Sequence, residues 1–337
     1  MQRIMTAICA VLFFTPLEAS IAESLSVYTH RQPALLEPIL DAYTKQSGVE
    51  FKIVYSPKGL VQRLQSEGSA TPADLVITVD INRVYELSKT DLLATLSSSK
   101  INKQVPAHLR DKNDKWTGLS LRARIAAVST QRVSQSEVSS LADFAEPRLK
   151  GRVCTRKGSH VYNRALLASI IANDGDAAAR KWAKGLVKNL ARKPQGNDRA
   201  QAKAIYSGEC DVALMNTYYY GKMKFNNKNP EQKKWAESLR LVFLDQKGRG
   251  QHVNISAAAV LKASKKQAAA VEFIEWLTSP EAQLLYTKVN YEYPVNPKVN
   301  PSKEVASWGR FKIDEVSLTD IAKNTPLAQM IINETGW

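Results

Sequence analysis

The chain has 337 residues, of which 44% are hydrophobic, and its formal net charge is +15. This length and composition fit a globular protein with two domains of ordinary size. A chain this basic is often a nucleic-acid-binding protein. Here, however, the Lys and Arg residues are scattered over most predicted helices, and no zinc-finger spacing occurs. We therefore expect a solvated basic surface and no nucleic-acid partner.

Residues 1–22 have the pattern of a cleaved export signal. Arg3 precedes an apolar run over residues 4–16, and the small residues Ser20 and Ala22 mark a plausible cleavage site. The run is shorter than the roughly 20 residues that span a bilayer, and the context of Cys9 is poor for lipid attachment. We expect a periplasmic protein that begins near Glu23.

The mature chain opens with strands and helices in alternation. Strands are predicted at residues 24–28, 51–55 and 73–79, and helices at 35–45, 59–67 and 82–89. Strands separated by helices of this length pair in parallel through right-handed crossovers. The first lobe is therefore predicted to be an α/β sheet.

Two long strand-like segments indicate crossings between lobes. Residues 116–130 lack a helical period and precede a second round of strands and helices over 151–245. Residues 252–261 are again strand-like and lead into helices at 266–278 and 280–290. This order predicts two α/β lobes joined by a two-strand hinge with a cleft between them, where ligand sites commonly form. The predicted domains are residues 23–121 with 250–297, and residues 122–249 with 298–337.

Two cysteines, Cys154 and Cys210, remain after cleavage of the leader, and both lie in short strand-like runs, at 152–155 and 209–215. An oxidising compartment favours a disulfide bond between them over two buried thiols.

Three consecutive tyrosines, Tyr218, Tyr219 and Tyr220, follow the predicted strand at 211–215. Ligands bind at strand ends in α/β sheets, and a turn here would direct two adjacent phenols at one point. Aromatic packing at a lobe surface is the alternative, and the triplet alone favours packing. A phenol ionises near pH 10 unless a cation compensates it, and a hard trivalent metal does so.

Other candidate residues lie at strand or helix ends. Tyr162 and Ser159 begin a helical run whose backbone amides are suited to hold an anion, although an N-cap with an incidental aromatic explains the segment equally well. His30 and Arg31 end the first strand, and His30 is either a metal ligand or a hydrogen-bonded loop residue.

Two arginines in the hinge segment, Arg122 and Arg124, share a face and offer a fork for an oxyanion, one serving while the other is a surface charge. No Gly-rich phosphate loop, two-histidine zinc helix or serine-hydrolase elbow is present, so no catalytic set is predicted.

Taken together, these segments resemble the bacterial periplasmic ferric-ion-binding proteins, the soluble components of ABC iron importers. The resemblance covers essentially the whole mature chain, and the matching segments are residues 28–33, 72–80, 122–124, 193–196, 216–221 and 291–294. It implies a type II periplasmic-binding-protein fold, no enzymatic activity, a monomer, and an inner-membrane ABC permease as partner.

The resemblance also implies roles for single residues. Tyr162, Tyr218 and Tyr219 would bind Fe³⁺, and Arg31, Arg122 and Ser159 would hold carbonate or another synergistic anion. Val79 stands where some relatives have a glutamate ligand, and His30 lies close to the histidine ligand of other branches. Two alternatives stay open: a binding protein of similar fold for an oxyanion or other small solute without metal, using Arg31, Arg122 and Arg124, and an iron-dependent redox enzyme.

Overall fold

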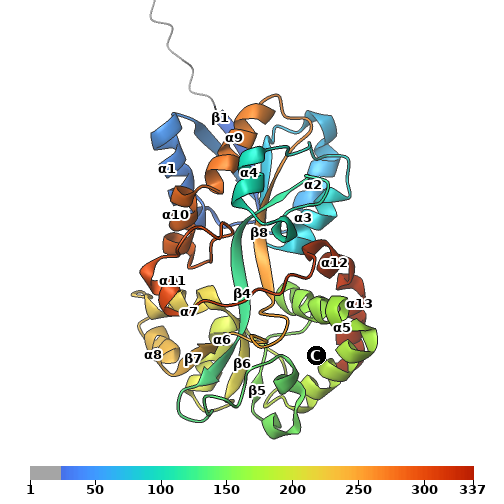
Figure 1. Ribbon diagram of the computed structural model, residues 1–337, viewed down its shortest axis with the longest axis vertical. Coiled ribbons are helices and arrows are strands. Elements are labelled where there is room, and N and C mark those ends of the chain that lie inside the picture. Colours follow the sequence, from blue (N-terminus) through green and yellow to red (C-terminus); the bar gives the residue numbers. More distant parts are fainter. Residues whose placement is uncertain (1–23) are drawn as a thin grey trace, which may run out of the picture.

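The computed structural model describes residues 24–337, so the predicted export signal at 1–22 and its cleavage site lie outside the described residues. Within them, eight strands form one sheet. Seven of these follow the order β2-β1-β3-β8-β4-β6-β5, and β7 pairs with β4 off this path. The two ends of this sheet belong to two α/β lobes, and the long strands β4 and β8 run from one lobe to the other (Figure 1).

The first lobe is built on β1 (Ser24–Thr29), β2 (Glu50–Tyr55) and β3 (Leu75–Thr78). β1 pairs in parallel with both neighbours, as the crossover argument predicts, whereas β3 pairs with β8 in the antiparallel sense. Its helices are α1 (Glu37–Ser47), α2 (Leu60–Glu67), α3 (Ile81–Ser88), α4 (Ser99–Gln104), α9 (Gln267–Leu277) and α10 (Pro280–Asn290). The predicted strands and helices of this lobe are confirmed to within a few residues.

The second lobe contains β5 (Val153–Cys154), β6 (Val212–Asn216) and β7 (Leu239–Val242). Its helices are α5 (Val161–Lys188), α6 (Asp198–Tyr206), α7 (Thr217–Lys224), α8 (Glu231–Glu237), α11 (Lys303–Ser307), α12 (Leu318–Lys323) and α13 (Thr325–Thr335). Helix α5 is kinked at Gly175, whose φ of 85° lies in the left-handed region that glycine adopts without strain. The predicted Cys154–Cys210 disulfide bond is present, between β5 and the residues that lead into β6.

The hinge consists of β4 (Thr117–Ser129) and β8 (Val253–Val260), whose residues are all buried. β4 pairs with β8 as far as Ala123, and from Arg124 onward it pairs with β6. The partner therefore changes within one residue, close to the predicted domain boundary at 122.

The chain also crosses between lobes after α10, where Tyr293 forms a bridge with Leu121 of β4. Near this crossing Tyr291 adopts a left-handed conformation and lies against α7, since a Cβ added at Gly221 would come within 2.6 Å of the Tyr291 ring. This packing ties the crossing segment to helix α7, which carries the tyrosine triplet.

None of the helices in residues 24–337 combines the length and the apolar character that a membrane span requires.

Candidate functional site

A cavity of about 320 Å³ lies between the lobes and is lined by residues of both. The second lobe contributes three phenols and two cations: Tyr162, Tyr218, Tyr219, Arg199 and Lys222. The first-lobe and hinge side contributes His30, Arg31, Val79, Arg83, Arg122 and Glu292, among others. The cavity is therefore rich in phenols and positive charge.

Tyr162 is positioned by the beginning of helix α5. His160 caps the helix, and its Nδ1 accepts a hydrogen bond from the backbone N–H of Tyr162 at 3.3 Å. The two rings also meet edge to face, with centroids 4.4 Å apart. Burial, followed by the nearby Arg156, lowers the pKa of His160 to about 3, so the imidazole stays neutral and can accept this bond.

The tyrosine triplet lies in the first turn of helix α7, which begins at Thr217 directly after β6. The expectation of a turn was therefore wrong in its geometry: a helix directs Tyr218 and Tyr219 into the cavity, with ring centroids 4.5 Å apart. Tyr220 packs against Trp308, away from this pair, at 5.8 Å between centroids. The structure thus separates the first two members of the triplet from the third.

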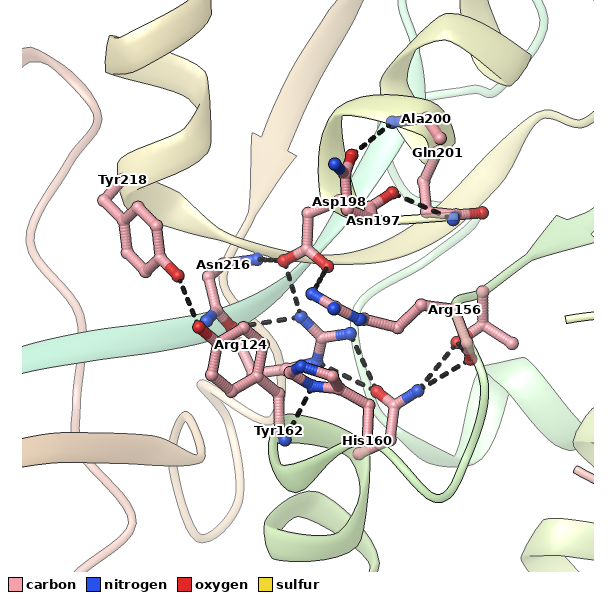
Figure 2. A network of polar contacts seen from close by, with 12 residues as sticks. Arg124, Arg156, His160, Tyr162, Asn197, Asp198, Ala200, Gln201, Asn216 and Tyr218 are labelled. Atoms are coloured by element: carbon pink, nitrogen blue, oxygen red, sulfur yellow. Dashed lines mark hydrogen bonds and ion pairs between the residues drawn. The ribbon is translucent and has the colours of Figure 1, made fainter. Parts of the chain in front are cut away.

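The phenols converge. The hydroxyl oxygens of Tyr162 and Tyr218 are 2.9 Å apart (Figure 2). Tyr162, Tyr218 and Tyr219 all line the cavity. Burial, together with the neighbouring Tyr162 phenol, raises the pKa values of Tyr218 and Tyr219. Both phenols are therefore neutral at ordinary pH unless a cation enters the cavity.

A buried ion pair between Arg124 and Asp198 lies beside Tyr162 (Figure 2). Arg124 donates to Asp198 at 2.9 Å, to Asn216 at 3.0 Å and to Asn163 at 2.7 and 3.1 Å, and it is almost fully buried. Its guanidinium lies 5.7 Å from the centre of the Tyr162 ring. Arg124 is thus neither a surface charge nor a cavity residue, and the expectation that one of Arg122 and Arg124 is exposed was wrong, because both are buried.

Arg31 lines the cavity, but its charge is already matched. Its guanidinium donates to both carboxylate oxygens of Glu292, at 3.1 and 2.9 Å, and to the hydroxyl of Ser256. Glu292 also accepts a hydrogen bond from Ser120. Although burial opposes ionisation of Glu292, Arg31 holds its pKa below the usual range, so the pair is charged.

The other predicted residues lie in different surroundings. Arg122 donates to the backbone carbonyls of Val79 and Ile255 at the cavity wall. His30 lines the cavity, its Nδ1 is buried without a partner, and burial lowers its pKa to about 3. Ser159 is exposed and is absent from the cavity lining.

Sequence reasoning missed Glu292, Arg199 and Lys222. Lys222 follows Tyr218 by one helical turn, which is the only local signal of its place. Its ammonium lies 5.2 Å from the centre of the Tyr218 ring, and burial lowers its pKa to about 8. The guanidinium of Arg199 lies 5.1 Å from the centre of the Tyr219 ring.

Within residues 24–337, no cluster of three or more histidine, cysteine, aspartate or glutamate side chains is arranged to hold a metal ion. The groups that gather in the cavity are phenol oxygens, which become strong ligands of hard cations once deprotonated.

Comparison with known proteins places the chain among solute-binding proteins. The model of the family described as bacterial extracellular solute-binding protein matches residues 39–313. Iron uptake protein A1 of Synechocystis is 37% identical over 94% of this chain and 88% of its own length.

Solved structures are also similar. Ferric iron-binding protein A of Mannheimia haemolytica, in an open conformation, has a TM-score of 0.88 and 43% identity, over 94% of this chain and 99% of that chain. A Trichodesmium protein in complex with iron and citrate ligands has a TM-score of 0.89 and 36% identity, over 93% of this chain and 99% of that chain. These matches confirm the type II periplasmic-binding fold. Proteins of this family bind solutes and do not transform them, which excludes the alternative of an iron-dependent redox enzyme. The chain belongs to the bacterial extracellular solute-binding proteins, in the branch of the periplasmic ferric-ion-binding proteins of iron importers.

Proposed function

We propose that the protein captures ferric iron in the periplasm and delivers it to an inner-membrane ABC permease, with Tyr162, Tyr218 and Tyr219 as metal ligands. The observation that carries this proposal is the convergence of three phenols in one interlobe cavity, two of them with hydroxyls 2.9 Å apart. The relatives described above, an iron uptake protein and a ferric iron-binding protein, support the same cargo.

The electrostatics of the cavity favour a trivalent cation. Fe³⁺ displaces three phenolic protons, and the resulting phenolates neutralise its charge where isolated phenolates would be unstable. Acid competes for the phenolates, and reduction to Fe²⁺ removes one unit of attraction, so both are expected to weaken retention.

A small oxyanion completes the coordination, carbonate being one candidate, and contacts from both lobes favour the closed state. Of the anion residues predicted from the sequence, Arg31 and Arg122 line the cavity and stay candidates for this role, whereas Ser159 lies outside the lining. His30 stays a candidate ligand on the first lobe. We expect the protein to act as a monomer.

The test is an absorption titration of the purified protein with ferric citrate. We expect a red-orange phenolate-to-iron band that the double replacement Tyr218→Phe/Tyr219→Phe abolishes. Tyr220→Phe is the matched control, because Tyr220 packs on Trp308, and it should keep the band. A wild-type protein that stays colourless would exclude the proposal.

The second candidate is an oxyanion-binding protein without metal, favoured by the arginines and the lysine that line the cavity. Calorimetric binding of an oxyanion by a protein that shows no iron band would support it.

A further inference from the structure

A second cavity, of about 480 Å³, lies beside the hinge strand β4, and none of its lining residues lines the interlobe cavity. Two segments form its walls together with Leu121 of β4. Residues 293–301 belong to the chain that crosses between the lobes after α10, and residues 306–313 run on from the end of α11. Its volume falls in the range of about 300–1,000 Å³ that is typical of small-molecule sites.

Both walls are held in place by hydrogen bonds to the hinge region. The backbone of Tyr293 exchanges two hydrogen bonds with Leu121, at 2.8 and 2.9 Å. On the other wall, the carbonyl of Lys312 accepts the backbone N–H of Gln251 at 2.8 Å, two residues before β8. Prolines fix the backbone of the first wall at three positions, 294, 297 and 301. A ligand that enters this cavity therefore does not have to order its walls, which removes one cost of binding.

The walls are largely apolar and include two aromatic rings. Tyr293 and Phe311 both line the cavity, and their rings meet edge to face with centroids 4.8 Å apart. Phe311 also stacks on Phe243, outside the lining, at 4.4 Å between centroids. Leu121 and Ile313 add aliphatic surface. Such a lining favours a flat apolar ring as ligand.

Among the described residues that line this cavity, Arg310 is the only charged one. Its guanidinium donates to the side-chain oxygen of Asn300, a residue of the opposite wall, at 3.1 Å, and it forms no ion pair within residues 24–337. Glu304 at the start of α11 is already paired with Lys224 at 2.8 Å. Arg310 thus keeps an uncompensated charge and free donors at the cavity, in the fork geometry that suits a carboxylate.

We propose that this cavity is a binding site for a small aromatic monocarboxylate. The ring of the ligand packs against Tyr293 and Phe311, and its carboxylate accepts hydrogen bonds from Arg310. The apolar walls account for the ring, and the single unpaired cation accounts for the acid group and for its single charge. The site is separate from the phenols, so the proposal goes beyond iron capture and does not depend on it.

The experiment is a ligand-observed NMR titration of the iron-free protein with benzoate, benzyl alcohol and acetate. We expect benzoate to bind with a dissociation constant below about 1 mM. Benzyl alcohol and acetate should bind at least about tenfold more weakly, because each offers only one of the two groups that the cavity recognises. Absence of benzoate binding, or equal affinities for benzoate and benzyl alcohol, would overturn the proposal.

The replacement Arg310→Gln tests the acid group. Benzoate should bind about 10- to 100-fold more weakly, the effect of losing a charged hydrogen bond, whereas benzyl alcohol should change less than about threefold. The matched control is Lys312→Gln, because Lys312 is exposed on the same segment but donates to the carbonyl of Gly248 at 2.8 Å and lies outside the lining. Unchanged benzoate affinity in Arg310→Gln, or equal losses in the two variants, would refute a role for Arg310.

The replacement Ala306→Phe tests the cavity itself. Ala306 is an exposed residue of α11 that lines the cavity, so a phenylalanine there should fill it and abolish binding of both benzoate and benzyl alcohol. Ser307→Phe is the matched control, because Ser307 is the next residue of α11, is exposed and lies outside the lining, and it should bind both ligands like the wild type.

Benzoate binding that survives Ala306→Phe would place the ligand elsewhere, for example among the cations of the interlobe cavity, and would overturn the proposal. If Ala306→Phe does not fold, the comparison of Arg310→Gln with Lys312→Gln decides in the same way. Every titration uses iron-free protein, so a protein that shows no iron band leaves this test intact, and failure of one proposal is distinguished from failure of the other.

Discussion

The replacement Asp198→Asn tests the buried ion pair of Asp198 with Arg124, which lies beside Tyr162. Asp198 is fully buried and pairs with Arg124 at 2.9 Å and with Arg156 at 3.2 Å. It also accepts the backbone N–H of Asn216, the residue before helix α7. An asparagine keeps the shape but leaves the charge of Arg124 buried without a counterion.

Removing one partner of a buried ion pair costs about 3–5 kcal/mol of stability. We expect a cost near the lower end of this range, because Arg124 keeps its hydrogen bonds to Asn163 and Asn216. We expect the free energy of unfolding, measured in urea at pH 7, to fall by about 3 kcal/mol. The matched control is Asp211→Asn, because Asp211 also pairs with two arginines but its side chain is 15% exposed. That variant should lose about 1 kcal/mol.

Although Asp198→Asn should destabilise the fold, we expect it to strengthen iron retention. After burial and the neighbouring phenols, the carboxylate of Asp198 raises the pKa values of Tyr218 and Tyr219. Without this negative charge the phenols ionise more readily, so Asp198→Asn should keep the iron band to a lower pH than the wild type. Equal destabilisation by the two asparagine variants, or iron release at a higher pH in Asp198→Asn, would refute the reasoning.

Three further predictions concern stability and the orientation of helix α7. Burial lowers the pKa values of His30 and His252 to about 3, so the folded state binds fewer protons than the unfolded chain below pH 6.5. The free energy of unfolding should therefore fall by about 2 kcal/mol per histidine between pH 7 and pH 5, and a flat urea profile would contradict this. Reduction of the second-lobe disulfide bond, which joins residues 56 apart, should cost about 4 kcal/mol, seen as a lower urea midpoint with reductant; equal midpoints would argue against it. Gly221→Ala would place a Cβ 2.6 Å from the Tyr291 ring, so we expect a loss of about 1–3 kcal/mol and a shifted iron band; Gly248→Ala, with its nearest atom at 3.7 Å, should show neither.

Most elements of the fold follow from local sequence patterns. The helix predicted at 280–290 coincides with α10, and the strand predicted at 24–28 is β1 without its last residue. Both are set by hydrophobic periodicity, which neighbouring residues determine. The structure of the tyrosine triplet was predicted less well. Asn216, the last residue of β6, is the N-cap of α7, and asparagine is typical both of turns and of helix starts, so the local pattern does not distinguish the two.

The sequence by itself determined the order of strands and helices, the two crossing segments and the disulfide partners, and its family resemblance singled out the three phenols that we propose as ligands. Only the tertiary structure decided which cations are free to meet a ligand. Arg31 meets its counterion 261 residues away, and Arg124 meets Asp198 at a separation of 74. Charge compensation depends on distances of a few ångströms between such remote residues, and local sequence patterns do not contain those distances.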